Sequence, residues 1–143
     1  NQPVVARGDC TFEELHAIFN KMETRLGETG AYLDRIYYCP HHPDKGFPGE
    51  VPELKIPCAC RKPQPGMILA AQKDLNIDLA QSWMIGDTSA DMLTGKRAGV
   101  KTILLETGHA GRDGKYDAVP DFVMPDLSAA VDFILRSENA ANP

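Results

Sequence analysis

Three cysteines and one histidine gather in two short motifs in the middle of the chain. One residue separates Cys39 from His41, and one residue separates Cys58 from Cys60. Thiolates and a neutral imidazole suit a tetrahedral zinc ion, and a set of three cysteines and one histidine leaves no coordination position open for substrate. We therefore predict a structural zinc site. His42 is the spare imidazole, because Cys-x-His lets both side chains point the same way at a strand end.

The same cysteines have two plainer explanations. They could include a disulfide pair and a spare thiol, or they could be small buried hydrophobic residues. A disulfide is disfavoured because Cys58 and Cys60 are only two positions apart and Cys10 lies far upstream. The stretch 44–57 between the motifs contains two glycines and three prolines and must be a loop. A loop of that length usually needs an anchor, which favours zinc.

Two cations follow the second cysteine motif directly. Arg61 and Lys62 precede Pro63 and a helix that we expect to begin at Gly66. A rigid metal loop would fix both cations in one place, where they could bind an anionic group. The motif therefore joins a structural site to a candidate binding site.

Composition limits what the chain can do. Its length of 143 residues fits one domain, residues 1–143, large enough for a core that does not need zinc to fold. Acidic residues outnumber basic ones by 20 to 15, so we expect no nucleic-acid partner and only local capture of an anionic substrate. No apolar run approaches the roughly 20 residues needed to cross a bilayer. We expect a cytoplasmic protein with no membrane partner.

Helices and strands are predicted to alternate along the chain. Thr11 and Glu14 form a capping box before a helix with one apolar face, and Ser128 is the predicted N-cap of the last helix, which runs to residue 135. The other predicted elements are strands at 34–39, 82–86, 101–106 and 122–124 and helices at 66–76 and 90–98. Apolar strands alternating with helices predict an α/β fold, a three-layer Rossmann-like parallel sheet covered on both faces.

Two carboxylates follow the predicted strand 82–86. Ligands of parallel sheets bind outside the carboxyl ends of the strands, so Asp87 in the turn and Asp91 one helical turn later can face one pocket. A carboxylate there could hold magnesium. Both could instead be helix N-terminal acids favoured by the macrodipole. Lys62 before one helix, together with the loop end at Asn1 and Gln2, favours a phosphate-handling site.

These segments resemble motifs of the haloacid dehalogenase superfamily. CRKPQPGM around Lys62 and GDTSADM after the strand look like its third and fourth motifs, and NQPVVARG resembles the segment after its second motif. With YYCPHHP added, the set is similar to the heptose 1,7-bisphosphate phosphatases and the related histidinol-phosphate phosphatases. The resemblance covers residues 1 to about 135. It implies a haloacid-dehalogenase-type domain with a zinc-stapled loop and no large cap domain.

The resemblance also implies a role for each matching residue. Lys62 would neutralise charge on an aspartyl-phosphate intermediate, Asp87 would ligate catalytic Mg²⁺, and Asp91 would orient Lys62 or a metal-bound water. The implied substrate-binding residues are Asn1, Gln2, Arg61, Lys62 and Thr88, the last at a position where some members carry lysine. The implied ligands of the structural Zn²⁺ are Cys39, His41, Cys58 and Cys60.

One motif of the superfamily is missing. Its enzymes attack phosphate with the first Asp of an Asp-x-Asp motif, and the sequence contains no Asp-x-Asp and no Ser or Thr before Asn1. Cys10 lacks the adjacent base or glycine loop that a nucleophilic cysteine needs. We expect the C-terminal part of a longer, monomeric enzyme. The part alone, without its first strand, should be inactive and prone to self-association through exposed sheet edges.

The length of the zinc loop favours one branch of the family. Sixteen residues, 42–57, lie between His41 and Cys58, whereas the resemblance implies a much shorter loop in the histidinol-phosphate enzymes. A heptose enzyme would remove the 7-phosphate of a heptose bisphosphate on the route to surface polysaccharide. Two other classes stay open: a catalytically silent zinc and phosphate binding module, and a zinc-ribbon scaffold for protein partners.

Overall fold

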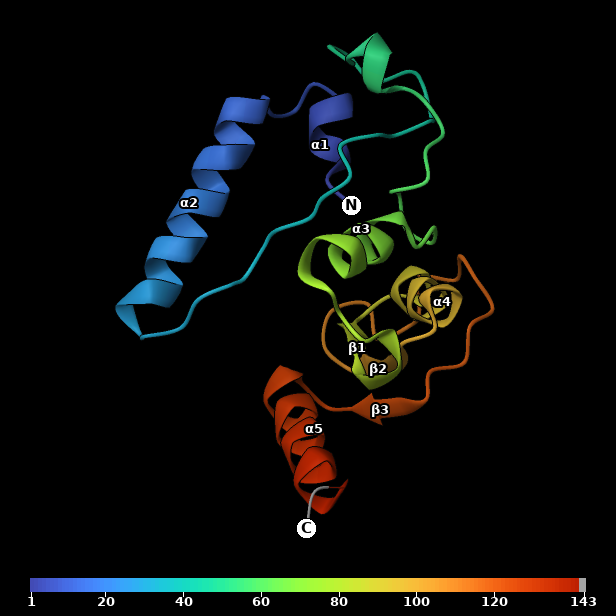
Figure 1. The fold of residues 1–143 in the computed structure, drawn as a ribbon. Coiled ribbons are helices and arrows are strands. Elements are labelled where there is room, and N and C mark those ends of the chain that lie inside the picture. The colour runs from blue at the N-terminus through green and yellow to red at the C-terminus, as the bar shows by residue number, and fades with distance from the viewer. Residues whose placement is uncertain (142–143) are drawn as a thin grey trace. The chain divides into compact units, whose positions relative to one another are not determined.

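The chain divides into two compact units, residues 1–61 and 62–143. The structure is a computed structural model that describes residues 1–141 (Figure 1). The first unit contains α1 (Pro3–Ala6), α2 (Phe12–Glu28) and the 3-10 helix η1 (Pro52–Leu54). The second contains α3 (Gly66–Leu75), the 3-10 helix η2 (Leu79–Gln81), β1 (Trp83–Gly86), α4 (Ser89–Ala98), β2 (Lys101–Leu105), β3 (Phe122–Met124) and α5 (Leu127–Ala141). None of the described helices is long and apolar enough to cross a membrane.

The long helix α2 begins at the predicted capping box. The Thr11 hydroxyl accepts from the Glu14 amide at 3.1 Å, and the Glu14 carboxylate accepts from the Thr11 amide at 2.8 Å. Both exchanges satisfy backbone donors that the first turn leaves without partners. Leu15 is buried on the apolar face, but Ile18 is 59% exposed. The described residues therefore cover only part of the apolar face of α2.

The predicted strand at 34–39 is wrong. This segment is irregular in the structure, although the amide of Gln2 donates to the carbonyl of Cys39 at 2.7 Å. A strand requires the repeating ladder bonds of a neighbouring strand, and the described residues supply no such neighbour to this segment. Its apolar character was therefore not sufficient to make it a strand. The segment still delivers Cys39 to a fully buried position.

The loop between the cysteine motifs packs on α1, a short helix that the sequence did not predict. The amide of Val51 donates to the carbonyl of Ala6 at 3.0 Å. Gly8 has φ of +77°, and a Cβ there would lie 1.9 Å from the Gly49 carbonyl oxygen. Glycine is thus required where the end of α1 meets the loop. The loop itself contains one regular turn, η1.

The strands β1, β2 and β3 form the predicted parallel sheet, in that order. α4 packs against β1 and β2, and α5 packs against β2 and β3. Gly95 of α4 lies over Met84 and Thr102 on one face. The ring of Phe133 of α5 packs 5.9 Å from that of Trp83, whose side chain points to the opposite face from that of Met84. A helix therefore covers each face, which confirms the α/β prediction for this unit.

The helix ends follow local sequence signals, with one exception. α3 and α4 end as predicted, with Asn76 and Gly99 in the left-handed conformation typical of C-caps. The exception is the predicted N-cap Ser128, which lies inside α5. The Asp126 carboxylate accepts from the Ala129 amide at 2.8 Å and fills that role. α5 also continues to residue 141, beyond the predicted end at residue 135.

Candidate functional site: a metal cluster and a lysine–carboxylate site

The four predicted zinc ligands come together in the first unit. Their ligand atoms, three Sγ and the imidazole nitrogen, lie within 4.8 Å of one another. The three Sγ–Sγ distances are 3.1, 3.3 and 3.5 Å, and Nδ1 of His41 lies 3.4 Å from the Cys60 Sγ. Ligands about 2.3 Å (sulfur) and about 2.0 Å (nitrogen) from a tetrahedral zinc ion would be roughly 3.5 to 3.8 Å apart. The cluster could therefore hold zinc after small adjustments.

The thiols of the cluster also fit a dication better than a disulfide. All the cysteines are free, and the sulfur separations far exceed the disulfide length of about 2.05 Å. Burial, reinforced by hydrogen bonding with Cys60, raises the pKa of Cys39 to about 12. Burial also raises the pKa of Cys60, whereas hydrogen bonds with the other two thiols outweigh burial and lower the pKa of Cys58. Thiolate ligands bind zinc in the deprotonated form, so a zinc ion bound here would offset the burial that raises the pKa of Cys39 and Cys60.

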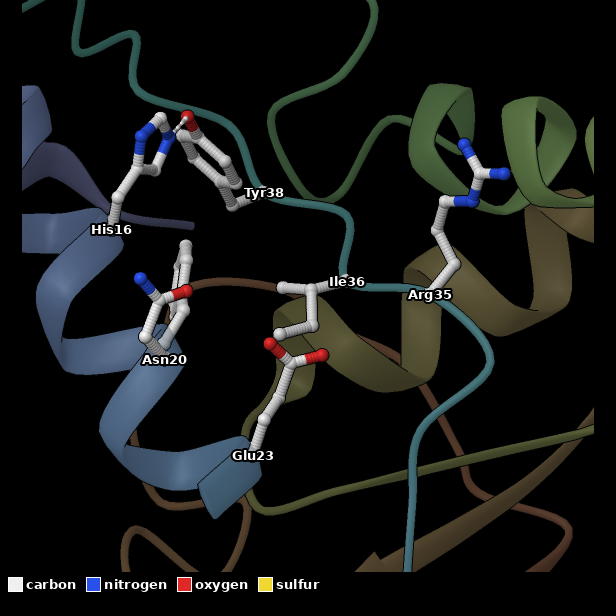
Figure 2. A pocket seen from close by; sticks show the side chains of 7 residues that line it. His16, Asn20, Glu23, Arg35, Ile36 and Tyr38 are labelled. Atoms are coloured by element: carbon white, nitrogen blue, oxygen red, sulfur yellow. Dashed lines mark hydrogen bonds between the residues drawn. The ribbon is translucent and has the colours of Figure 1, made fainter.

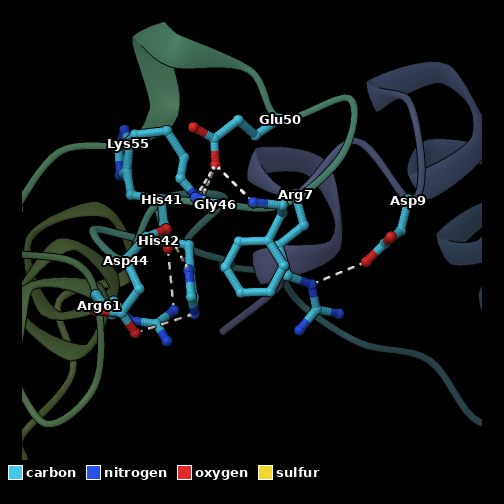
Figure 3. A network of polar contacts seen from close by, with 10 residues as sticks. Arg7, Asp9, His41, His42, Asp44, Gly46, Glu50, Lys55 and Arg61 are labelled. Atoms are coloured by element: carbon cyan, nitrogen blue, oxygen red, sulfur yellow. Dashed lines mark hydrogen bonds and ion pairs between the residues drawn. The ribbon is translucent and has the colours of Figure 1, made fainter.

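A polar network stiffens the loop that carries the cluster (Figure 3). The Glu50 carboxylate accepts from the amides of Gly46 and Phe47 at 3.0 and 3.1 Å. The side chain of Lys55 is only 1% exposed, with Nζ 3.4 Å from the Glu50 carboxylate and 4.6 Å from the centre of the Phe47 ring. The hydrogen bond from the Phe47 amide is the main reason why the pKa of Glu50 is lowered. The loop thus has an internal scaffold that does not depend on metal.

Arg61 and His42 lie beside the candidate metal ligands without belonging to the cluster. His42 contacts the carbonyl of Asp44 through Nδ1 at 3.3 Å and meets the Phe47 ring edge-on. It is therefore outside the metal cluster, as predicted. The guanidinium of Arg61 donates to the carbonyl of His41 at 3.0 Å. This bond ties the predicted substrate-binding arginine to a ligand residue of the cluster.

In the second unit, Lys62 pairs with Asp91. The Lys62 ammonium lies 2.5 Å from Oδ1 of Asp91, and the amide and hydroxyl of Thr88 donate to Oδ2 at 3.1 and 2.7 Å. Asp91 is 4% exposed. Burial would raise its pKa, but the hydrogen bonds from Lys62 and Thr88 outweigh burial and lower it. One carboxylate oxygen of Asp91 thus contacts the Lys62 ammonium, and the other caps the start of α4.

The close approach of Lys62 to α4 depends on two further residues. A Cβ at Gly86 would lie 2.5 Å from the Asp91 side chain, so glycine at the end of β1 makes room for that carboxylate. The guanidinium of Arg97 donates to the carbonyl of Pro63 at 3.1 Å. The segment after the cysteine motif is therefore tied to α4 at two points. The Lys62–Pro63 peptide bond is cis.

Asp87 occupies the turn between β1 and α4, at the carboxyl end of the sheet. The amide of His109 donates to its Oδ2 at 2.9 Å, and the amide of Gly111 donates to its carbonyl at 2.8 Å. In phosphate-handling sites, magnesium commonly binds one or two carboxylates, and water and phosphate complete the coordination shell of the ion. The residue present therefore fits the predicted magnesium ligand.

Asp113 and Ser89 form a contact that the sequence reasoning missed. The two carboxylate oxygens of Asp113 accept from the amide and the hydroxyl of Ser89 at 2.7 and 2.8 Å. The Ser89 amide is the main cause that lowers the pKa of Asp113. The Ser89 hydroxyl also accepts from the Tyr116 amide at 3.1 Å. The closely spaced glycines after β2 indicate a tight loop, but no local pattern pairs residue 113 with residue 89.

The remaining predicted site residues divide between the units. Asn1, Gln2 and Arg61 belong to the first unit, and Lys62 begins the second. The hydroxyl of Thr88 donates to the Asp91 carboxylate and accepts from the Asp91 amide at 3.2 Å. The structure thus gives Thr88 a capping role, and its substrate contact stays a prediction. The substrate contacts of Asn1, Gln2 and Arg61 also stay predictions.

A pocket of about 350 Å³ opens in the first unit at residues that no motif indicated. Figure 2 shows its lining residues, which are His16, Phe19, Asn20, Glu23, Arg35, Ile36 and Tyr38. The imidazole of His16 and the hydroxyl of Tyr38 are 2.8 Å apart. None of the predicted site residues lines this pocket, and we give it no catalytic role.

Comparison with known proteins places the chain in a family. Residues 59–130 match the model of the HAD-hydrolase-like family. The chain also superposes on the crystal structure of D,D-heptose 1,7-bisphosphate phosphatase from B. bronchiseptica, complexed with magnesium and phosphate. The TM-score is 0.77 at 33% identity, over 96% of this chain and 72% of that chain. This chain belongs to the haloacid dehalogenase-like hydrolases. The family prediction from the motifs is confirmed.

Two sequence relatives share one name, which describes a phosphatase activity. The D-glycero-beta-D-manno-heptose-1,7-bisphosphate 7-phosphatase of Yersinia pestis is 41% identical over 96% of this chain and 65% of its own length. The Pasteurella multocida protein of the same name is 45% identical over 82% of this chain and 62% of its own length. The chain therefore spans less than two thirds of the length of these relatives.

A second solved structure is also similar. A putative HAD-like phosphatase from Mesorhizobium loti superposes with a TM-score of 0.75 at 32% identity, covering 97% of this chain and 63% of its own.

Proposed function

We propose that this chain is part of a magnesium-dependent phosphatase that removes the 7-phosphate of D-glycero-D-manno-heptose 1,7-bisphosphate. The observation that carries the proposal is the second unit's site, where Asp91 orients the Lys62 ammonium and Asp87 follows β1. The magnesium and phosphate of the B. bronchiseptica structure support the chemistry. The names of the sequence relatives support the sugar.

In the proposed reaction, the chain supplies charge and orientation for phosphoryl transfer. Lys62 donates to oxygens of the transferring phosphoryl group, and Asp91 holds it in place for that contact. Magnesium bound through Asp87 would neutralise phosphate charge. The nucleophile would be the first Asp of an Asp-x-Asp motif, which is absent from residues 1–143. Its attack on phosphorus would break the bond to the sugar oxygen, which would leave as a hydroxyl with a proton from the second Asp, and water would then hydrolyse the aspartyl-phosphate to release phosphate. We therefore propose that residues 1–143 alone are inactive.

The zinc cluster has a structural part in this proposal. Four protein ligands leave no coordination position for substrate, so bound zinc would only fix the loop. The bond from Arg61 to the carbonyl of His41 would then hold the arginine for the distal phosphate or the sugar. The 16 residues between His41 and Cys58 favour the heptose substrate over histidinol phosphate, which is the alternative substrate.

The test compares two proteins in one assay. The coding sequence, together with whatever precedes it, is expressed beside residues 1–143, and phosphate release is measured with Mg²⁺ from heptose 1,7-bisphosphate and from histidinol phosphate. We expect turnover only by an extended protein that contains Asp-x-Asp, with preference for the heptose. If the extended protein prefers histidinol phosphate, then histidinol phosphate is the substrate and the heptose assignment is wrong.

A second candidate is a catalytically silent zinc and phosphate binding module, to which the Cys39, His41, Cys58 and Cys60 cluster and Lys62 would equally belong. In that case no Asp-x-Asp would be found upstream, and both proteins would be inert. Binding of inorganic phosphate would persist. That combination of results would remove the phosphatase proposal.

A further inference from the structure

The loop between β2 and β3 returns over the carboxylate that we propose as the magnesium ligand. We define the 107–116 loop as Thr107–Tyr116. Its His109 amide donates to Oδ2 of Asp87 at 2.9 Å, and its Gly111 amide donates to the Asp87 carbonyl at 2.8 Å. Gly108 has φ of +63°, and a Cβ there would lie 2.2 Å from Oδ2 of Asp87. The loop backbone therefore rests directly on Asp87.

One side chain ties this loop to the other side of the same turn. Asp113 receives the amide and the hydroxyl of Ser89, the first residue of α4, and the Tyr116 amide donates to the same hydroxyl. The Ser89 amide is one of the donors that a helix start leaves without an intrahelical partner. Ser89 is 5% exposed, so the clamp ends on a buried residue, whereas Asp113 itself is only partly buried. Asp113 therefore clamps the loop onto the start of α4.

We propose that Asp113 is a positioning residue for the magnesium site. By clamping the 107–116 loop onto Ser89, it keeps the His109 amide on Oδ2 of Asp87 and would thereby hold that carboxylate in place for Mg²⁺. The inference rests on the proposed function, which makes Asp87 the magnesium ligand. Partners that orient a metal ligand typically account for about 10- to 100-fold in metal affinity.

The chain contains a matched control for a purely structural role. Asp121 accepts from the amide and the hydroxyl of Thr102 at 2.8 and 2.7 Å, which repeats the bonding pattern of Asp113 and Ser89. This second clamp joins the start of β2 to the residue before β3. Loss of either clamp should destabilise the second unit, but only Asp113 holds the loop that contacts Asp87.

The experiment measures loop protection and metal binding in the full chain. Amide hydrogen exchange is followed at His109 and Gly111, and Mg²⁺ binding is followed by isothermal titration. The variants are Asp113→Ala, Asp113→Asn and the control Asp121→Ala, with Asp87→Asn to identify the metal site. In Asp113→Ala we expect exchange to accelerate by about tenfold or more and the Mg²⁺ dissociation constant to rise by about 10-fold or more. Asp121→Ala should change neither.

Two further variants grade the effect. Asp113→Asn keeps an oxygen for the Ser89 amide but loses one acceptor, so its loss of affinity should be smaller than that of Asp113→Ala. Gly108→Ala places a methyl group against Asp87 and should weaken Mg²⁺ binding while leaving the Asp113 clamp in place. Equal losses in Asp113→Ala and Asp121→Ala would overturn the proposal.

The remaining outcomes separate this inference from the proposed function. Faster exchange in Asp113→Ala with unchanged Mg²⁺ affinity would overturn the inference, because Asp113 would then be structural only. Unchanged exchange would overturn it as well. If the unaltered chain binds no Mg²⁺, the magnesium role of Asp87 fails before any variant is made, and the inference falls with it.

Discussion

Replacing Asp91 by asparagine should cost the second unit about 3 kcal/mol of its free energy of unfolding. The substitution keeps the shape of the side chain and an oxygen for the Thr88 amide, but removes the charge that faces Lys62. Breaking a buried ion pair from one side typically costs about 3 to 5 kcal/mol, because the remaining charge loses its close counterion. The Lys62 side chain is 24% exposed, so water can partly solvate it and the lower end applies.

The measurement is urea unfolding followed by fluorescence of Trp83, the one tryptophan of the chain. Trp83 lies in β1 with its ring against Phe122 and Phe133, so its emission reports the second unit. With a urea dependence of about 1.5 kcal/mol per molar, the midpoint should fall by about 2 M. Asp132→Asn, at an exposed position of α5, is the matched control and should leave the midpoint unchanged.

A double-mutant cycle isolates the pair itself. In a Lys62→Met background the buried charge has no cation to compensate, so Asp91→Asn should cost much less there than in the unaltered chain. We expect a coupling energy of about 1.5 to 3 kcal/mol, in the range found for residues in one polar network. A coupling energy below about 0.5 kcal/mol would refute the reasoning, because the contact between Lys62 and Asp91 would then contribute almost nothing to stability.

Three further predictions concern acid, metal and capping. Because the folded-state pKa of Asp91 is lowered, its stabilisation is present above about pH 4 and is lost as pH falls through the folded pKa. The stability gap between the unaltered chain and Asp91→Asn should therefore be constant at neutral pH and shrink in acid. Cys39→Ser should abolish binding of one zinc per chain in a metal assay, whereas Cys10→Ser should bind zinc normally. Asp126→Ala should lower the free energy of unfolding by about 1 kcal/mol through loss of the α5 cap, and Ser128→Ala should have little effect.

Local signals in the sequence predicted most of the regular elements. The capping box at Thr11 placed the start of α2, and Gly99 marked the end of α4. The prediction of Ser128 as the N-cap of the last helix was wrong, because Asp126 is an equally favoured N-cap and only the path of the chain after β3 decides between them. Elements defined by a residue and its near neighbours were therefore predictable.

Features that depend on distant partners were not predictable in the same way. The segment 34–39 has a strand-like composition, but a strand exists only where a neighbour supplies ladder bonds. The clamp between Asp113 and Ser89 joins residues that no motif connects. The metal cluster was predictable because ligand chemistry is itself a long-range constraint. Four residues of the right types imply a meeting point whatever the fold between them.

The most direct test of the account is whether Lys62 and Asp87 form one phosphate and magnesium site. Isothermal titration of the chain with inorganic phosphate, with and without Mg²⁺, measures this without turnover. We expect Mg²⁺ to strengthen phosphate binding, and we expect Lys62→Met or Asp87→Asn to remove the Mg²⁺-dependent part. Phosphate binding that ignores Mg²⁺ and survives both substitutions would contradict it.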